Sequence, residues 1–285
     1  MLQKIAVIGA GTMGNGITHV FAQAGFNVHL TDVSALQLEK AIQTISKNLD
    51  RQIAKQTASE ETKLKALSNI KTFSSIGDGV KDVELVIEAA TENTDLKLSI
   101  FRELDAHVNE TCILASNTSS ISITKIASVT KRPDKVIGMH FMNPVPVMKL
   151  VEIINGYATD KKVTETIVEL SKQLGKTPCV VNDYPGFIAN RILMPMINEA
   201  IYSLYEGVAG VEEIDTIMKL GMSHPMGPLQ LADFIGLDVC HAILNVLYEG
   251  LGKTHYVPCP LLTKMVASGQ LGVKSGKGFY EYKGK

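Results

Sequence analysis

A short apolar strand that leads into a glycine-rich turn and then a helix opens this chain. Lys4–Ile8 is apolar, the turn Gly9-Ala-Gly-Thr-Met-Gly14 follows it, and Asn15–Ala24 has helical spacing. In this arrangement the first glycine permits a tight turn, the second lets a pyrophosphate approach the backbone, and the third allows close helix–strand packing. The N–H groups at the start of the helix attract phosphates. The opening therefore predicts a dinucleotide-binding α/β domain, and we assign the cofactor to Gly9, Gly11, Thr12, Met13 and Gly14.

An acid at the end of the next apolar run specifies the nucleotide. Asp32 stands 18 residues after Gly14 and directly follows Asn27–Thr31. A carboxylate at this place accepts hydrogen bonds from ribose hydroxyls and repels a 2′-phosphate. Because positions 33 to 38 contain no basic residue, the sequence favours NAD over NADP. The alternatives are a flavin bound by a similar fold and a nucleotide-binding protein without chemistry.

Short apolar runs alternate with amphipathic segments through the first two-thirds of the chain. Their two-sided hydrophobicity suits a buried parallel sheet, and the segments between them are long enough for crossover helices. The expected strands are Lys4–Ile8, Asn27–Thr31, Leu85–Ala89, Thr111–Ala115, Lys135–Met139 and Leu150–Ile154. The pattern predicts an α/β fold with a Rossmann-type, doubly wound, mainly parallel sheet.

The connection after the second expected strand is unusually long. Residues 34–71 are about twice as long as an ordinary crossover. Their apolar spacing predicts a helix, a break at Thr57-Ala-Ser59 and a second short helix, together a helical hairpin insertion. Seven Lys or Arg residues in this segment face four Asp or Glu residues. The insertion is either a solvated hairpin or a cationic arm for a phosphorylated ligand.

A turn-forming linker, Asn182-Asp-Tyr-Pro-Gly186, divides the chain. After it the periodicity is helical, with candidate helices at Ile188–Tyr205, Val211–Leu220, Leu229–Tyr248 and Pro260–Ser268. We expect residues 1–182 to form the NAD-binding domain and residues 183–285 an all-α domain that completes a substrate cleft. The many apolar positions on these helices exceed what one small domain buries, which predicts a homodimer or higher homo-oligomer.

The composition excludes several classes of protein. The 28 Lys or Arg residues nearly balance the 29 Asp or Glu residues, which argues against a nucleic-acid or membrane surface. The four cysteines form no C-x-x-C pair, and no apolar run approaches the roughly 20 residues that span a bilayer. The first strand begins almost at Met1, which leaves no room for a signal peptide. We expect a cytoplasmic protein with no metal site and no nucleic-acid or membrane partner.

One histidine and one carboxylate stand in neighbouring apolar runs. His140 lies inside the first run and Glu152 lies in the second, Leu150–Ile154, with Pro144 and Pro146 between them. A loop held open by prolines can set the two strands side by side, and the carboxylate against the imidazole. Such a pair can act as a general base, because histidine titrates near neutrality and the carboxylate fixes its tautomer. The alternative is a core histidine followed by a surface charge. A bound nicotinamide favours catalysis, since oxidising an alcohol requires a base.

Three further segments fall where ligands bind in a fold of this kind. Ala115-Ser-Asn-Thr-Ser-Ser120 and Ala89-Ala-Thr-Glu-Asn93 each follow a strand, at the carboxyl edge of the sheet. Pro185-Gly-Phe-Ile-Ala-Asn-Arg191 opens the first helix of the second domain. Serines of the first segment can also simply cap the next helix. These segments extend the candidate site beyond the histidine and the carboxylate.

Together these segments resemble the L-3-hydroxyacyl-CoA dehydrogenase family. The resemblance covers essentially the whole chain, from Gly9 to Lys274-Ser-Gly-Lys-Gly-Phe-Tyr280. Its specific parts are S-N-T-S-S, H-F-M-N-P with a downstream Glu, and P-G-F-I-A-N-R. The resemblance implies reversible, NAD-dependent oxidation of an (S)-3-hydroxyacyl-CoA. The compact length is similar to that of the bacterial members that act on 3-hydroxybutyryl-CoA.

The resemblance also implies roles for individual residues. His140 would be the acid/base, Glu152 would orient it, and Ser119 would bond the substrate oxygen. Asn190 would bond the substrate region and help hold the two domains around it. Contacts to NAD are implied for Glu92, Lys97, Asn117, Ser119, Asn143 and Lys274. Contacts to the CoA part of the substrate are implied for Asn48, Lys55 and Ser119.

Two positions depart from the pattern of the family. Asn48 stands where the family often has Ser, and Met142 replaces a frequent Phe beside His140. An asparagine can still donate to a phosphate or a ribose, so the departure affects only the CoA contact of that residue. The methionine would reshape the acyl pocket without touching the chemistry.

Three other functions fit part of the pattern. A hydroxy-acid dehydrogenase of the 6-phosphogluconate type places a lysine base on the helix that enters the second domain, where this chain has Asn190-Arg191. A relative that acts on free hydroxy or sugar acids would not need the cationic insertion. A non-enzymatic NAD-binding protein would need neither His140 nor Glu152. The cationic insertion and the joint presence of His140 and Glu152 favour oxidation of a CoA thioester over these alternatives.

Overall fold

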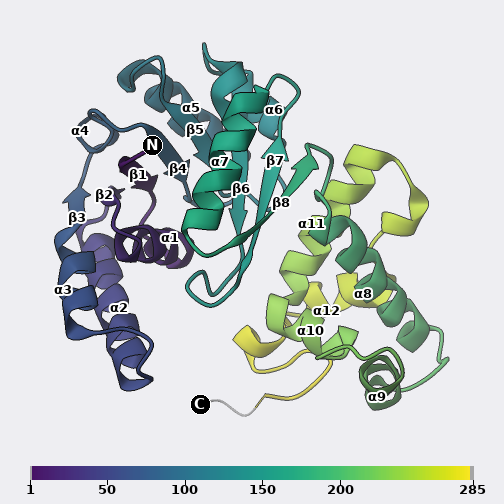
Figure 1. The fold of residues 1–285 in the computed structure, drawn as a ribbon. Helices are drawn as coiled ribbons and strands as arrows, with labels where there is room; N and C mark the ends of the chain where they lie inside the picture. The colour runs from purple at the N-terminus through teal and green to yellow at the C-terminus, as the bar shows by residue number, and fades with distance from the viewer. Residues whose placement is uncertain (1, 283–285) are drawn as a thin grey trace. The chain divides into compact units, whose positions relative to one another are not determined.

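A computed structural model describes residues 2–282 and divides the chain into two compact units. The first unit ends at Asp183 and the second begins at Tyr184. Figure 1 shows the first in purple to teal and the second in green to yellow. The expected fold class, a mainly parallel Rossmann-type sheet followed by an all-helical domain, is confirmed.

An eight-stranded sheet forms the centre of the first unit, in the order β3-β2-β1-β4-β5-β6-β7-β8. Neighbouring strands are parallel except β6 and β7, which pair antiparallel. The strands are β1 (Lys4–Ile8), β2 (Asn27–Thr31), β3 (Ile70–Phe73), β4 (Leu85–Glu88), β5 (Ile113–Ser116), β6 (Val136–Phe141), β7 (Leu150–Asn155) and β8 (Thr177–Asn182). The inner strands are almost wholly buried because helices pack on the sheet (Figure 1).

The helices of the first unit connect these strands. They are α1 (Thr12–Gln23), α2 (Ala35–Ala54), α3 (Glu60–Ser68), α4 (Ile76–Gly79), α5 (Thr94–His107), α6 (Ile123–Ala127) and α7 (Lys161–Gln173). Side chains of α1, α2 and α7 share one apolar core with the sheet. The insertion at residues 34–71 contains the two helices α2 and α3, whose N-termini are capped by Ser34 and Ser59.

Two strands of the sheet do not carry the expected signal. β3 is short and only partly buried, and β8 is mostly exposed and contains Pro178. Both lie at the edges of the sheet, where a strand pairs on one side only and does not need two-sided hydrophobicity. The strand expected at Lys135–Met139 also extends to Phe141, so His140 lies within β6.

The second unit consists of helices α8 (Ala189–Tyr205), α9 (Val211–Gly221), α10 (Pro228–Ile235), α11 (Leu237–Leu251) and α12 (Pro260–Ala267). The single helix expected at Leu229–Tyr248 is wrong, because Gly236 breaks it with a positive φ of 104°. Within residues 2–282, no single helix has the length and hydropathy of a membrane span. Only α10 and α11 together pass that test, and they are bent by 97°.

Two buried carboxylates fasten the end of the described chain to the second unit. Asp233 on α10 accepts the backbone N–H groups of Phe279 and Tyr280 and the hydroxyl of Tyr282. The hydroxyl of Tyr280 in turn donates to Asp215 on α9, at 2.8 Å. Burial raises the pKa of Asp233 despite these donors. The tail is thus held by hydrogen bonds to two neighbouring helices.

Candidate active site

The glycine turn lies between β1 and α1 and leaves room only for backbone. A Cβ atom on Gly9 would lie 2.8 Å from the carbonyl oxygen of Ala89, and one on Gly14 would lie 1.7 Å from the carbonyl oxygen of Gly9. A Cβ on Gly11 would meet no atom within 4 Å, so this glycine faces open space. Thr12 and Met13 begin α1 directly behind it. The turn therefore offers bare backbone and a helix N-terminus to a phosphate group.

Asp32 is held in place at the end of β2 by two backbone donors. The Ala10 N–H donates to Oδ2 at 2.8 Å, and the Ser34 N–H donates to Oδ1 at 2.9 Å. A cavity of about 690 Å³ lies against this carboxylate, and Gly9, Gly11 and Ile100 also line it. Its volume and its mixture of apolar side chains with the carboxylates of Asp32 and Glu103 suit the adenosine half of NAD.

The loops after four strands meet at one edge of the sheet. Register places Ile8 beside Glu88, Glu88 beside Ser116, and Ser116 beside Gly138. Because these four strands are parallel, the glycine turn, residues 89–93, residues 117–120 and the end of β6 follow one another along this edge. The expected residues of the glycine turn, of residues 89–93, of residues 117–120 and of the end of β6 are brought together there.

His140 and Glu152 face each other across the antiparallel pair β6–β7. They are direct register partners, and the imidazole Nδ1 lies 2.8 Å from the carboxylate Oε2. The His140 side chain is 12% exposed and that of Glu152 is 4% exposed, so water has little access to the pair. The Asn117 Oδ1 accepts the N–H of Phe141 at 2.8 Å, which ties the end of β6 to the loop after β5.

The carboxylate of Glu92 accepts several hydrogen bonds from the serine-rich loop after β5. Its Oε1 accepts the hydroxyl of Thr118 at 2.6 Å and both the N–H and the hydroxyl of Ser119, at 3.0 and 3.2 Å. The N–H and the hydroxyl of Ser120 also donate to it. Burial works to raise the pKa of Glu92, but these bonds and the charge of Lys97 outweigh it and lower that pKa. Glu92 therefore remains an anion that fixes the position of Ser119.

Lys97 lies beneath this loop rather than beside open space. Its side chain is fully buried, and its Nζ forms an ion pair with the fully buried Glu88 at 2.7 Å and lies 3.5 Å from Oε2 of Glu92. The Ser116 hydroxyl donates to the other oxygen of Glu88 at 2.7 Å. The NAD contact expected for Lys97 stays a prediction; in the structure its Nζ contacts the carboxylates of Glu88 and Glu92.

Glu88 and Ser116 were not expected as parts of the site. Both are fully buried at the ends of apolar strands, and the sequence gives no partner for either. One signal was present in the sequence, because an acid that ends an otherwise apolar run requires a buried partner. The partner, Lys97, is nine residues away on α5 and becomes evident only in the fold.

The remaining expected residues are distributed over both units. Asn143 is exposed on the loop between β6 and β7. Asn190 is half-buried in the first turn of α8, and the Nζ of Lys274 lies 2.6 Å from Oδ2 of Asp238 within the second unit. Asn48 accepts a hydrogen bond from Arg51, and Lys55 is exposed at the end of α2. The contacts expected for these residues stay predictions.

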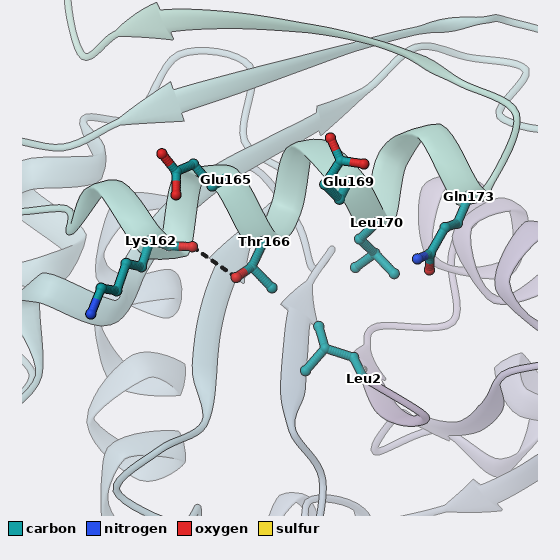
Figure 2. A pocket seen from close by; sticks show the side chains of 7 residues that line it. All are labelled: Leu2, Lys162, Glu165, Thr166, Glu169, Leu170 and Gln173. Carbon is teal, nitrogen blue, oxygen red and sulfur yellow. Dashed lines mark hydrogen bonds between the residues drawn. The ribbon is translucent and has the colours of Figure 1, made fainter.

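A separate hollow lies along α7 and contains none of the expected residues. Leu2, Glu169 and Leu170 are among the side chains around it (Figure 2). The hydroxyl of Thr166 there is already bonded to the carbonyl of Lys162, four residues earlier on the same helix. Within residues 2–282, no group of three or more His, Cys, Asp or Glu side chains could hold a metal ion. The glycine turn and the His140–Glu152 edge are therefore the candidate site.

Comparison with known proteins gives the same family over both units. Residues 4–184 match the NAD binding domain of 3-hydroxyacyl-CoA dehydrogenase, and residues 186–282 match its C-terminal domain. The chain is 56% identical to the 3-hydroxybutyryl-CoA dehydrogenase of Bradyrhizobium diazoefficiens, over 100% of this chain and 97% of that protein. It is 52% identical to the protein of the same name from Clostridioides difficile, over 98% of this chain and 99% of that protein.

A solved structure shows the same similarity in three dimensions. The crystal structure of (S)-3-hydroxybutyryl-CoA dehydrogenase from Ralstonia eutropha superimposes with a TM-score of 0.98 at 51% identity, and each chain is covered completely. The match to an NAD binding domain confirms NAD as the expected cofactor and an NAD-dependent oxidoreductase as the expected class of enzyme. On these grounds the chain belongs to the 3-hydroxyacyl-CoA dehydrogenase family.

Proposed function

We propose that this protein catalyses the reversible, NAD-dependent oxidation of an (S)-3-hydroxyacyl-CoA, with 3-hydroxybutyryl-CoA as its substrate, to the 3-oxoacyl-CoA. The observation that carries the proposal is the His140–Glu152 pair, 2.8 Å apart and at the same edge of the sheet as the glycine turn. The names of the relatives, 3-hydroxybutyryl-CoA dehydrogenases at 52 to 56% identity, support the choice of substrate.

The pair suits the proton transfer of this reaction. Bound NAD supplies the acceptor for the hydride that leaves C3 of the substrate. For His140 to act as the base, its Nδ1–H donates a hydrogen bond to Glu152, 2.8 Å away, and its Nε2 takes the 3-hydroxyl proton. The imidazolium that forms is stabilised by the carboxylate, and the proton returns to the oxygen in the reverse reaction.

The neighbouring residues orient the substrate and the cofactor in this proposal. Ser119, fixed by Glu92, bonds the 3-hydroxyl or keto oxygen, and Asn190 bonds the substrate region from the second unit. Asn143 and Glu92 contact the nicotinamide half, whereas Lys97 supports Glu92 from below.

The insertion α2–α3 supplies the positive charge for the CoA part of the substrate. Lys55 is exposed at the end of α2, and Arg51 lies one turn earlier, where it also donates to Asn48. Cationic side chains on an exposed helix end attract the phosphates of CoA, whereas a free hydroxy acid has no such group. This charge is the feature that favours a CoA thioester over a free acid.

Oxidation of NADH with acetoacetyl-CoA, followed by absorbance, tests the proposal. We expect turnover with NADH, much weaker turnover with NADPH, and none with free acetoacetate. His140→Ala should abolish turnover while NADH still binds, and His107→Ala, which alters an exposed histidine on α5, should leave both unchanged. Folded protein that binds NADH but reduces no acyl-CoA would exclude the substrate. Near-native turnover by His140→Ala would exclude the base.

The second unit also supports the proposal of a homo-oligomer. It exposes several large apolar side chains, among them Ile192 (67%) on α8, Leu220 (81%) on α9 and Met222 (61%) directly after α9. Exposed apolar groups of this size favour contact with another protein surface. Light scattering during size-exclusion chromatography should give a multiple of the 30.9 kDa chain mass; a mass of one chain would exclude the oligomer.

A further inference from the structure

A buried lysine holds the loop that separates the two members of the acid/base pair. Lys176 directly precedes β8, and it is only 9% exposed. Its Nζ donates to the carbonyl oxygen of Val145 at 2.5 Å and to that of Met148 at 2.8 Å. Both carbonyls belong to residues 142–149, the loop that connects the strand of His140 to the strand of Glu152 (Figure 1).

The ammonium group has carbonyl oxygens rather than a carboxylate as its partners. Within residues 2–282, no Asp or Glu oxygen lies within 4.0 Å of Lys176 Nζ. Burial lowers the pKa of Lys176, and burial together with the charge of Lys176 lowers the pKa of the neighbouring His19, although a hydrogen bond to Oε1 of Gln23 opposes this. A charge buried in this way is costly unless hydrogen bonds compensate it, and here the loop carbonyls do so.

The loop is attached at further points on both sides. Val145 is 2% exposed and packs on α1, where a Cβ atom on Gly16 would lie 2.9 Å from the Val145 Cβ. The carbonyl of Lys149 accepts the N–H of Thr177, the residue after Lys176. Lys176 therefore lies where the loop, the edge of the sheet and the helix of the glycine turn meet.

Asn143 is one of the exposed residues of this loop. It stands two residues before Val145, on the same loop, and three residues after His140. Its neighbour Pro144 accepts the N–H groups of Val147 and Met148 through its carbonyl, both at 2.9 Å, so the loop is a compact turn. Because the turn is compact, we expect it to move as a rigid unit when the hydrogen bond at Val145 or the one at Met148 is lost.

We propose that Lys176 is a positioning residue of the active site, which fixes residues 142–149 so that Asn143 meets the cofactor. The inference rests on the proposed function for the role of Asn143. It assigns to Lys176 no contact with substrate or cofactor. If Lys176 only stabilised the fold, its substitution would lower the melting temperature, but the effect would not depend on Asn143.

A double-mutant cycle between Lys176→Met and Asn143→Ala separates these two roles. The readouts are the dissociation constant of NADH, measured by its fluorescence, and kcat/KM with acetoacetyl-CoA. We expect Lys176→Met to weaken NADH binding and to lower kcat/KM by about 10- to 100-fold. The double variant should be no worse than Asn143→Ala alone, because both changes remove the same interaction. Lys172→Met, on α7 and in an exposed ion pair with Glu169, is the matched control and should behave as the unaltered protein.

Two results would overturn the inference. One is native NADH binding and turnover by folded Lys176→Met, and the other is multiplication of its effect with that of Asn143→Ala. If Lys176→Met does not fold, Lys176→Gln replaces it in the cycle, because glutamine keeps a hydrogen-bond donor. The same two results would then overturn the inference. NADH binding does not depend on the acyl substrate, so a wrong substrate would leave the binding cycle interpretable and would affect only the turnover readout.

Discussion

The candidate site has two parts, the His140–Glu152 pair and the loop that carries Ser119, and they are held in place in different ways. His140 and Glu152 lie on paired strands, and the register of β6 and β7 alone brings their side chains to 2.8 Å. Ser119 lies on a loop, and its position depends on the single carboxylate of Glu92, which in turn lies above the buried pair of Lys97 and Glu88. One part is fixed by backbone hydrogen bonds and the other by charge.

Because of this difference, mutations in the two parts should have different effects on catalysis and on stability. Changing a side chain of the strand pair should remove chemistry and leave the structure around it intact, because the backbone bonds remain. Changing a charged residue beneath the loop should disturb structure first and chemistry second, because a buried partner is left uncompensated. The following variants test whether the two parts respond in these opposite ways.

The largest effect is expected for Glu152→Gln in the strand pair. The amide cannot stabilise the imidazolium of His140, so kcat should fall by about a thousand- to ten-thousandfold. The melting temperature and the NADH dissociation constant should stay close to those of the unaltered protein. Glu169→Gln, an exposed change on α7, is the control. A kcat within a few fold of the unaltered value would remove Glu152 from its orienting role.

The buried charges should dominate stability. Lys97→Met leaves Glu88 without its cation and should lower the free energy of unfolding by about 3–5 kcal/mol, measured by urea denaturation. Adding Glu88→Gln should recover most of this loss, because the uncompensated charge is then gone. Lys161→Met alters an 89%-exposed lysine and should have no effect. If the double variant were as unstable as Lys97→Met, the ion pair would not be what supports the loop.

A smaller effect on catalysis is expected for Glu92→Ala. The N–H groups of Ser119 and Ser120 lose their acceptor, and a displaced Ser119 should lower kcat/KM with acetoacetyl-CoA by about 10- to 100-fold. Glu165→Ala, on the exposed side of α7, serves as the control. An effect as large as that of Glu152→Gln would mean that both parts of the site act as one unit.

The smallest effect is expected in the pH dependence of stability, through Glu92. The pKa of Glu92 is lowered from 4.5, so its carboxylate contributes stability that is fully present above pH 4.5 and is lost as the pH falls through the lower, folded-state pKa. The difference in free energy of unfolding between the unaltered protein and Glu92→Gln should thus be constant from pH 7 to pH 5. It should shrink in more acidic urea titrations, and a difference that grew with acid would contradict the assignment.

The sequence was most informative where local geometry alone decides the role of a residue. Gly9, Gly14 and Asp32 lie where the motif predicts, because a tight turn and a strand end need no distant partner. The proline-containing loop also predicted that His140 and Glu152 face each other, and the antiparallel register agrees. What the sequence could not provide are contacts between elements far apart in the chain. Lys176 reaches a loop 28 to 31 residues earlier, and Gly236 breaks a helix whose apolar spacing is continuous.

The order of strands keeps two properties of the enzyme apart. Asp32 follows β2, and His140 lies in β6, with β1, β4 and β5 between these strands. At the usual spacing of strands this places about 19 Å between them, beyond the distance at which mutations ordinarily interact. An evolving lineage, or a designer, can therefore exchange the dinucleotide preference proposed for Asp32 while keeping unchanged the acid/base chemistry proposed for His140.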